Sequence, residues 1–98
     1  MGRVALNVDT VVEQRTARNV IAELPGGSRV VMAGGHLDSV PEGPGLNDNA
    51  SGSALLLEVA ERLAAAPGRK ATLRLGFWTA EELGLFGAAA YVRSLSRA

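Results

Sequence analysis

The alternation of apolar and polar residues predicts strands in the first third of the chain. Apolar positions alternate loosely over residues 4–24, and the turn Pro25-Gly26-Gly27 closes this segment. We expect one long bent strand or two antiparallel strands there. The unbroken apolar run Val30-Val31-Met32-Ala33 predicts a central strand covered on both faces. Gly34-Gly35 ends that strand, and His36 follows at its carboxyl tip.

The next apolar pattern has the spacing of a helix. Over residues 51–66, apolar side chains recur every three or four positions on one face, and charged side chains occupy the opposite face. Ser51 or Ser53 can cap the start of this helix, and Pro67-Gly68 stops it. The sequence therefore predicts an amphipathic helix that packs on the preceding strand.

A further strand and a second helix complete the pattern. Residues 71–79 alternate with Leu73, Leu75 and Phe77 on one face, and the alanine-rich residues 83–96 have helical spacing. The predicted order is β-β-β-α-β-α, so the fold class is α/β with a mixed sheet and flanking helices. The last two strands and the helix between them form a crossover unit. We expect these two strands to be parallel and the crossover to be right-handed.

This arrangement gathers polar residues at one edge of the sheet. His36 and Asp38 follow one parallel strand, Glu81-Glu82 follow the other, and Asn47-Asp48-Asn49 lead into the crossover helix. Ligands of open α/β sheets bind beyond the carboxyl ends of the strands. We therefore expect a functional site at this edge.

Composition limits the chemistry available to that site. The 98 residues suit one small domain, residues 1–98, and they contain no cysteine and a single histidine. Thiolate zinc sites, disulfides and three-histidine sites within one chain are therefore excluded. Carboxylates must carry most of any chemistry. One imidazole with hard oxygen ligands suits zinc or manganese better than copper.

Charge and hydropathy argue against two classes of partner. Ten Lys+Arg and ten Asp+Glu give zero net charge, which provides no electrostatic surface for nucleic acid. The longest apolar stretch, residues 54–66, is interrupted by charged side chains, so we expect no membrane-spanning segment. The first 20 residues have no signal-peptide pattern, and localisation stays open.

Each candidate residue also has an ordinary structural explanation. A lone histidine such as His36 is more often structural than a ligand. Asp48 resembles a helix-capping residue, and Glu81-Glu82 could complement a helix dipole in its first turn. In the functional interpretation, one carboxylate of the Glu-Glu pair binds a metal and the other holds or removes a proton. Residue types alone leave both interpretations open.

Three sequence blocks together resemble a known family. Residues 31–40 read VMAGGHLDSV, residues 45–52 read GLNDNASG, and residues 77–87 read FWTAEELGLFG. In this order and at these gaps they are similar to the co-catalytic two-zinc aminopeptidases, metallopeptidase family 28 of clan MH, which includes bacterial leucyl aminopeptidases. The resemblance covers nearly all of residues 3–96. It implies a zinc-exopeptidase fold and hydrolysis of N-terminal peptide bonds in peptides with a free N-terminus.

The resemblance implies a role for each candidate residue. His36 would be a terminal ligand of one zinc, and Glu82 a terminal ligand of the other. Asp48 would bridge both metals and precede a cis peptide bond. Asp38 would support His36 from behind. Glu81 would be the general base that takes a proton from the attacking water.

One part of the family pattern is not found in this sequence. The family needs a further acidic ligand and a further histidine after the Glu-Glu pair, and residues 83–98 contain no Asp, Glu, His or Cys. We therefore expect residues 1–98 to be an incomplete, truncated N-terminal half of a catalytic domain that is inactive alone. An uncovered sheet edge would then favour self-association.

Three alternatives stay open at this stage. In a reduced site, His36, Asp48 and Glu82 would gather around one zinc, with Glu81 as the base. A non-catalytic fold fragment or interaction module would keep the motifs by descent. A relative of the glutaminyl cyclases or glutamate carboxypeptidases would share parts of the motifs, although the Glu-Glu-Leu-Gly-Leu-Phe-Gly sequence of residues 81–87 looks more like that of aminopeptidases.

Overall fold

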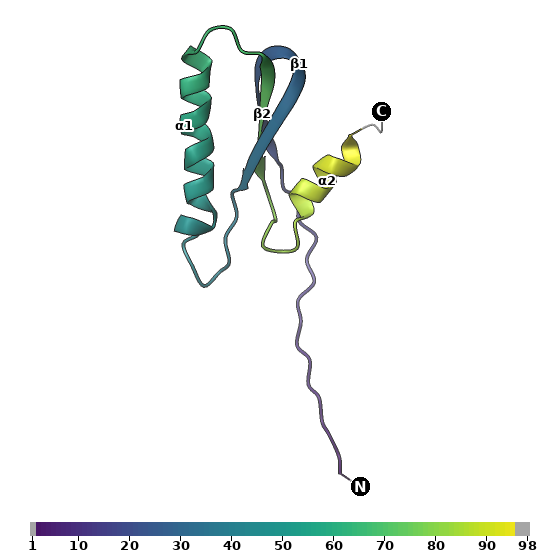
Figure 1. Ribbon diagram of the computed structural model, residues 1–98. Coiled ribbons are helices and arrows are strands. Elements are labelled where there is room, and N and C mark those ends of the chain that lie inside the picture. Colours follow the sequence, from purple (N-terminus) through teal and green to yellow (C-terminus); the bar gives the residue numbers. More distant parts are fainter. Residues whose placement is uncertain (1, 96–98) are drawn as a thin grey trace.

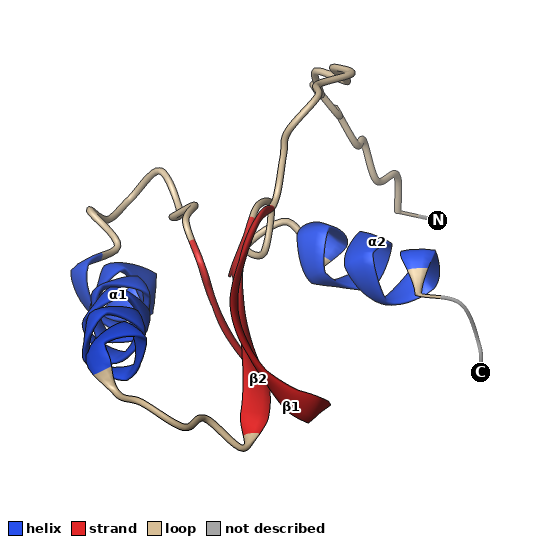
Figure 2. Cartoon of the chain, turned by 90° about the horizontal axis from the view of Figure 1, so that it is seen from above, coloured by secondary structure: helices blue, strands red, loops and turns tan. Residues whose placement is uncertain are grey.

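The structure, a computed structural model, is a mixed α/β arrangement of two strands and two helices, and it describes residues 2–95 (Figure 1). The helices lie on opposite sides of the sheet, as both views show (Figure 2). In chain order, the elements are β1 (Val20–His36), a short π-helical turn η1 (Leu46–Ala50), α1 (Ser51–Ala65), β2 (Ala71–Trp78) and α2 (Phe86–Ser94).

Strand β1 bends around the end of β2. Residues 20–24 pair with residues 77–73 in descending order, whereas residues 29–36 pair with residues 71–78 in ascending order. A strand has one neighbour on each edge, so the two arms of β1 lie on opposite edges of β2. The predicted turn at Pro25-Gly26-Gly27 is this bend. The parallel pairing of residues 29–36 with β2 is confirmed.

The bend requires glycine because two backbones meet there. A Cβ atom on Gly26 would lie 2.1 Å from the carbonyl oxygen of Ala71, and one on Gly27 would lie 2.2 Å from that of Lys70. Any side chain at either position would displace the start of β2. The glycine pair thus allows β1 to turn closely around β2.

The strand expected before Val20 is not formed. Residues 2–19 contain neither helix nor strand, and they extend away from the sheet (Figure 1). The exposed fractions of Val4, Leu6 and Val8 are 96%, 86% and 67%. An alternating sequence becomes a strand only where a partner offers hydrogen bonds and an apolar face. Within the described residues, no strand pairs with residues 2–19, and only at the end of this segment does the Asn19 side chain bond to Thr79 and Gly87.

The hydrophobic core lies between β2 and α1. Leu56, Leu75 and Phe77 are buried, and Leu75 is only 1% exposed. Ala60 and Leu73 pack against them, which confirms the inward row predicted for the last strand.

The prediction that residues 30–33 form a covered central strand is wrong. Val30 and Val31 are 48% and 50% exposed. The strand flanked on both edges is β2, because β1 folds around it. The described residues cover little of the second arm of β1, residues 29–36, so its apolar side chains stay exposed.

Helix α1 matches its predicted range to within one residue, but its start is not capped by a serine side chain. The Ser51 hydroxyl donates to the Asn47 carbonyl oxygen at 2.8 Å. The Ser53 hydroxyl is buried and donates to the His36 carbonyl oxygen at 3.0 Å. Ser53 therefore ties the first turn of α1 to the last residue of β1.

Helix α2 begins three residues later than predicted. Gly84 and Leu85 have φ angles of +119° and +60°, which helical residues do not adopt, so residues 81–85 form a turn instead. The predicted end at Ser96 lies outside the described residues. Tyr91 of α2 accepts a hydrogen bond from Arg74 and packs 5.3 Å from the Trp78 ring. Among the described residues, no helix is long and apolar enough to cross a membrane.

Candidate metal centre

His36 stands at the end of β1, where its ring is 6% exposed. Its Nε2 atom lies 2.8 Å from Asp48 Oδ1 and 3.6 Å from Glu81 Oε2. Its Nδ1 atom lies 3.0 Å from the carbonyl oxygen of Asp38. A carbonyl oxygen only accepts, so Nδ1 is the donor. Nε2, which faces the carboxylates of Asp48 and Glu81, is therefore the nitrogen available to a metal.

Asp38 joins the ends of the two parallel strands. Its Oδ1 accepts the backbone N–H of Glu81 at 3.0 Å, and its Oδ2 accepts that of Glu82 at 3.1 Å. Oδ1 also lies 3.5 Å from His36 Nδ1. One carboxylate thus holds the Glu81-Glu82 backbone and lies behind the imidazole at the same time.

These contacts change the ionisation of two groups. Burial lowers the pKa of His36, but the hydrogen bond to Asp48, the Asp38 carbonyl group and the Glu81 charge together raise it above its ordinary value. Burial raises the pKa of Asp38, but the backbone amides of Glu81 and Glu82 outweigh this effect and lower it. These contacts therefore favour an imidazolium beside carboxylates.

Glu81 and Glu82 lie in the turn between β2 and α2, not in a helix. Two amides, those of Gly84 and Leu85, donate to the Glu81 carbonyl oxygen at 2.9 and 2.8 Å. Ala80, just before the pair, has φ of +53°, which is uncommon for a residue with a side chain. Since α2 has no acidic residue in its first turn, the helix-dipole interpretation of the pair is wrong.

Asp48 is presented by η1, where its φ and ψ angles of −123° and 87° are not helical. The peptide bond from Asp48 to Asn49 is cis, as the family resemblance implied. The Asp48 side chain is 75% exposed, and its carboxylate faces His36. The aspartate is thus an accessible oxygen donor beside a buried imidazole.

The donor set fits a metal ion. One ligand atom from each of His36, Asp48 and Glu82 can be chosen so that all three lie within 4.8 Å of one another. One imidazole nitrogen and two carboxylate oxygens are donors that divalent metal sites use. Glu81 is near the same point but outside this group of three.

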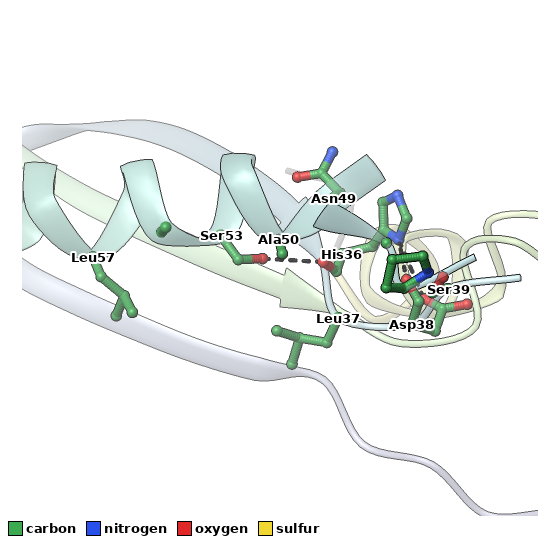
Figure 3. Close-up of a pocket in the computed structure, with 11 residues that line it drawn as sticks. His36, Leu37, Asp38, Ser39, Asn49, Ala50, Ser53 and Leu57 are labelled. Atoms are coloured by element: carbon green, nitrogen blue, oxygen red, sulfur yellow. Dashed lines mark hydrogen bonds and ion pairs between the residues drawn. The ribbon is translucent and has the colours of Figure 1, made fainter. Parts of the chain in front are cut away.

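All five residues singled out from the sequence therefore meet at the predicted edge of the sheet. Ser53 was missed as a member of the site because it was expected to cap a helix, and Asn49, although expected at this edge, was given no role there. A hollow of about 330 Å³ lies beside His36 (Figure 3). Its lining includes Leu37, Asn49, Ser53 and Leu57. No periodicity in the sequence could have indicated these contacts.

Comparison with known proteins decides the family. Residues 19–98 match the family model of peptidase family M28. The chain belongs to peptidase family M28. The match confirms the family that the three sequence blocks predicted.

Named relatives of this M28 chain include several aminopeptidases. It is 58% identical over 81 residues to a probable lipoprotein aminopeptidase of Mycobacterium tuberculosis, covering 81% of the chain and 16% of that protein. It is 50% identical over 94 residues to a probable leucine aminopeptidase 2 of Arthroderma benhamiae, covering 94% and 19%. It is 53% identical over 87 residues to leupeptin-inactivating enzyme 1 of Streptomyces exfoliatus, covering 85% and 20%. The M28 chain thus spans about a fifth or less of the length of these relatives.

Proposed function

We propose that this chain provides part of the centre of a zinc-dependent aminopeptidase, in which His36, Asp48 and Glu82 hold the metal. The observation that carries the proposal is the convergence of their ligand atoms to within 4.8 Å at the ends of two parallel strands. The aminopeptidase names of the relatives support the reaction class. The substrates would be peptides with a free N-terminus.

Glu81 is the proposed general base. Its carboxylate lies 3.6 Å from His36 Nε2 and is 30% exposed, so both the site and solvent reach it. Zinc, when bound, supplies Lewis acidity that polarises a carbonyl group and makes water more acidic. Glu81 would take the proton from the water that attacks the scissile carbonyl carbon. It would then return that proton to the leaving amine.

Asp38 is proposed to orient rather than to react. Its two oxygens accept the amides of Glu81 and Glu82, so the two glutamates are held in register with His36. Because Asp38 also lies behind the imidazole, it favours the orientation in which Nε2 points to the other carboxylates. This division leaves Glu81 free to move protons while Glu82 serves as a ligand.

We also propose that residues 1–98 belong to a catalytic domain with the zinc-exopeptidase fold. The parallel pair of strands joined through α1 supports this. Self-association of the chain through residues 29–36 of β1 is a separate proposal. It is supported by Val30 and Val31 of this segment, which are about half exposed.

Calorimetric zinc titration tests the ligand set, and hydrolysis of a leucine anilide tests the chemistry. We expect Glu82→Ala and His36→Ala to abolish stoichiometric zinc binding, whereas Glu81→Ala keeps it. Glu61→Ala, which removes an exposed carboxylate of α1, is the matched control and should bind zinc as the parent chain does.

The two measurements separate the ligand set from the catalytic role. Turnover that is lost in Glu81→Ala would show a working centre within this chain. Zinc binding without turnover would show that these residues hold the metal but do not complete the centre alone. Absence of zinc binding in the parent chain would overturn the proposal.

A further inference from the structure

Asn49 has a buried polar atom that its surroundings do not satisfy. Its side-chain oxygen is inaccessible to solvent and has no hydrogen-bond partner among the described residues. An unpaired buried acceptor costs free energy, so its position needs a cause. Asn49 directly follows Asp48, and Figure 3 shows its side chain beside the first turn of α1.

Two glycines make the space that Asn49 occupies. A Cβ atom on Gly52 of α1 would lie 2.0 Å from Asn49 Oδ1, and one on Gly35 of β1 would lie 3.1 Å from it. The asparagine side chain therefore fills a gap between the helix and the strand that a side chain on Gly52 would close and one on Gly35 would narrow. Gly35 directly precedes His36, so this gap adjoins the metal centre.

The position of Asp48 depends on its neighbours because its own carboxylate has little support. That side chain is 75% exposed, and among the described residues its hydrogen-bond partner is His36. On the other side of the gap, Ser53 donates to the His36 carbonyl oxygen at 3.0 Å. The turn that carries Asp48 therefore meets β1 at two points, the Asp48–His36 contact and the Asn49 side chain beside Gly35, while Ser53 ties the following helix to His36.

We propose that Asn49 is a positioning residue. Its side chain, held between Gly35 and Gly52, places the Asp48 carboxylate opposite His36 Nε2. The zinc measurement below rests on the proposed function, but the stability and resonance measurements do not. They use the metal-free chain, so failure of the metal site and failure of this inference give different results.

The direction in which Gly52→Ala shifts the thermal midpoint tests whether Asn49 packs against Gly52. Alanine normally stabilises a helix relative to glycine, so Gly52→Ala should raise the thermal midpoint if nothing opposes the new methyl group. With Asn49 present, we expect the midpoint to fall, because the methyl group and Oδ1 would overlap. In the Asn49→Ala background, the same substitution should raise it. A rise in both backgrounds would overturn the packing argument.

Gly43→Ala is the matched control for the loss of glycine. Its nearest contact would be a Val40 methyl group at 4.0 Å, and its φ angle is not in the left-handed region. Its effect should not depend on the residue at position 49. If Gly43→Ala shows the same sign reversal between backgrounds, the reversal does not arise at Gly52, and the inference fails.

The nitrogen resonance of His36 Nε2, measured at one pH in the metal-free chain, tests the positioning. Asp48→Asn gives the reference shift, since it removes the carboxylate charge beside Nε2. Asn49→Ala and Gly52→Ala should move the resonance in the same direction. Asn49→Ala adds no atom that could clash with its neighbours, so the His36 resonance can be measured in this variant even if Gly52→Ala does not fold. A resonance unchanged in Asn49→Ala, or unchanged in the reference, would overturn the proposal.

Zinc affinity provides the functional readout. We expect Asn49→Ala to weaken zinc binding by about tenfold or more, the usual cost of losing a residue that orients a metal ligand. The double variant with Gly52→Ala should bind zinc no more weakly than the weaker single variant. Loss of thermal stability with unchanged zinc affinity would make Asn49 merely structural. If the parent chain binds no zinc, the metal proposal fails, and the His36 resonance still decides the role of Asn49.

Discussion

Asp38 Oδ1 accepts the backbone N–H of Glu81 at 3.0 Å, although 43 positions separate the two residues in the chain. The contact joins the segment after β1 to the turn after β2. It therefore holds the imidazole of His36 and the Glu81-Glu82 pair on one edge of the sheet. The arrangement of the centre depends on this carboxylate, which is not itself one of the three grouped ligands.

Asp38→Asn should destabilise the chain. The amide keeps one acceptor oxygen and replaces the other by an N–H₂ group, which faces a backbone N–H and cannot accept from it. We expect the free energy of unfolding to fall by about 1–3 kcal/mol, the cost of leaving a buried donor without a partner. Urea unfolding measures this loss. Asp9→Asn, in the exposed N-terminal segment, is the control and should leave the midpoint unchanged.

Stability of the metal-free chain should peak in mildly acidic solution. The pKa of Asp38 is lowered in the folded chain, so this group stabilises the fold above about pH 3.9, the pKa of an aspartate in the unfolded chain. This stabilisation is lost as the pH falls through the pKa of the folded state. The pKa of His36 is raised in the folded chain, so this group stabilises the fold fully below about pH 6.5, the pKa of a histidine in the unfolded chain. This stabilisation is lost as the pH rises through the pKa of the folded state.

Urea midpoints measured between pH 2 and 9 with a chelator present check this profile. His36→Gln should remove the alkaline decline, and Asp38→Asn should weaken the acid decline. A parent profile that stays flat as the pH rises from about 6 to 9 would contradict the direction given for His36.

Leu75→Ala should be the costliest substitution in the core. Leu75 is 1% exposed and packs with Leu56 and Phe77. Removing its branched side chain leaves a cavity, for which we expect a loss of about 2–5 kcal/mol in the free energy of unfolding. Leu55→Ala is the control, because Leu55 lies on α1 and is 62% exposed. Equal losses at both positions would show that the core does not lie between β2 and α1.

Val31→Lys should weaken self-association. Val31 is half exposed on the second arm of β1, and a lysine on an exposed strand opposes pairing with another chain. Sedimentation equilibrium at several concentrations measures the effect. Val4→Lys, in the extended segment, should change the association constant little. If only Val4→Lys lowers it, the contact between copies lies in residues 2–19 instead.

Local sequence patterns predicted the elements whose partners are close in the chain. The spacing of apolar residues placed α1 to within one residue and identified the inward row of β2 around Leu75. The same patterns failed where a partner was needed. Apolar positions alternate loosely over residues 4–24, but residues 2–19 form no strand in the described structure, and Asn19 bonds to Thr79 and Gly87 through its side chain. Periodicity reports which side chains share a face, not whether another element covers that face.

The sequence by itself determined the family and the residue types of the site, because the three motif blocks hold His36, Asp38, Asp48 and the Glu-Glu pair at characteristic gaps. Only the tertiary structure decided how these residues meet. The register of β1 against β2 brings Asp38 to the amides of Glu81 and Glu82, and Asn49 fits between Gly35 and Gly52. The contacts of Asp38 with the two glutamates and of Asn49 with Gly35 join separate elements, and their geometry arises from strand pairing and packing rather than from local propensity.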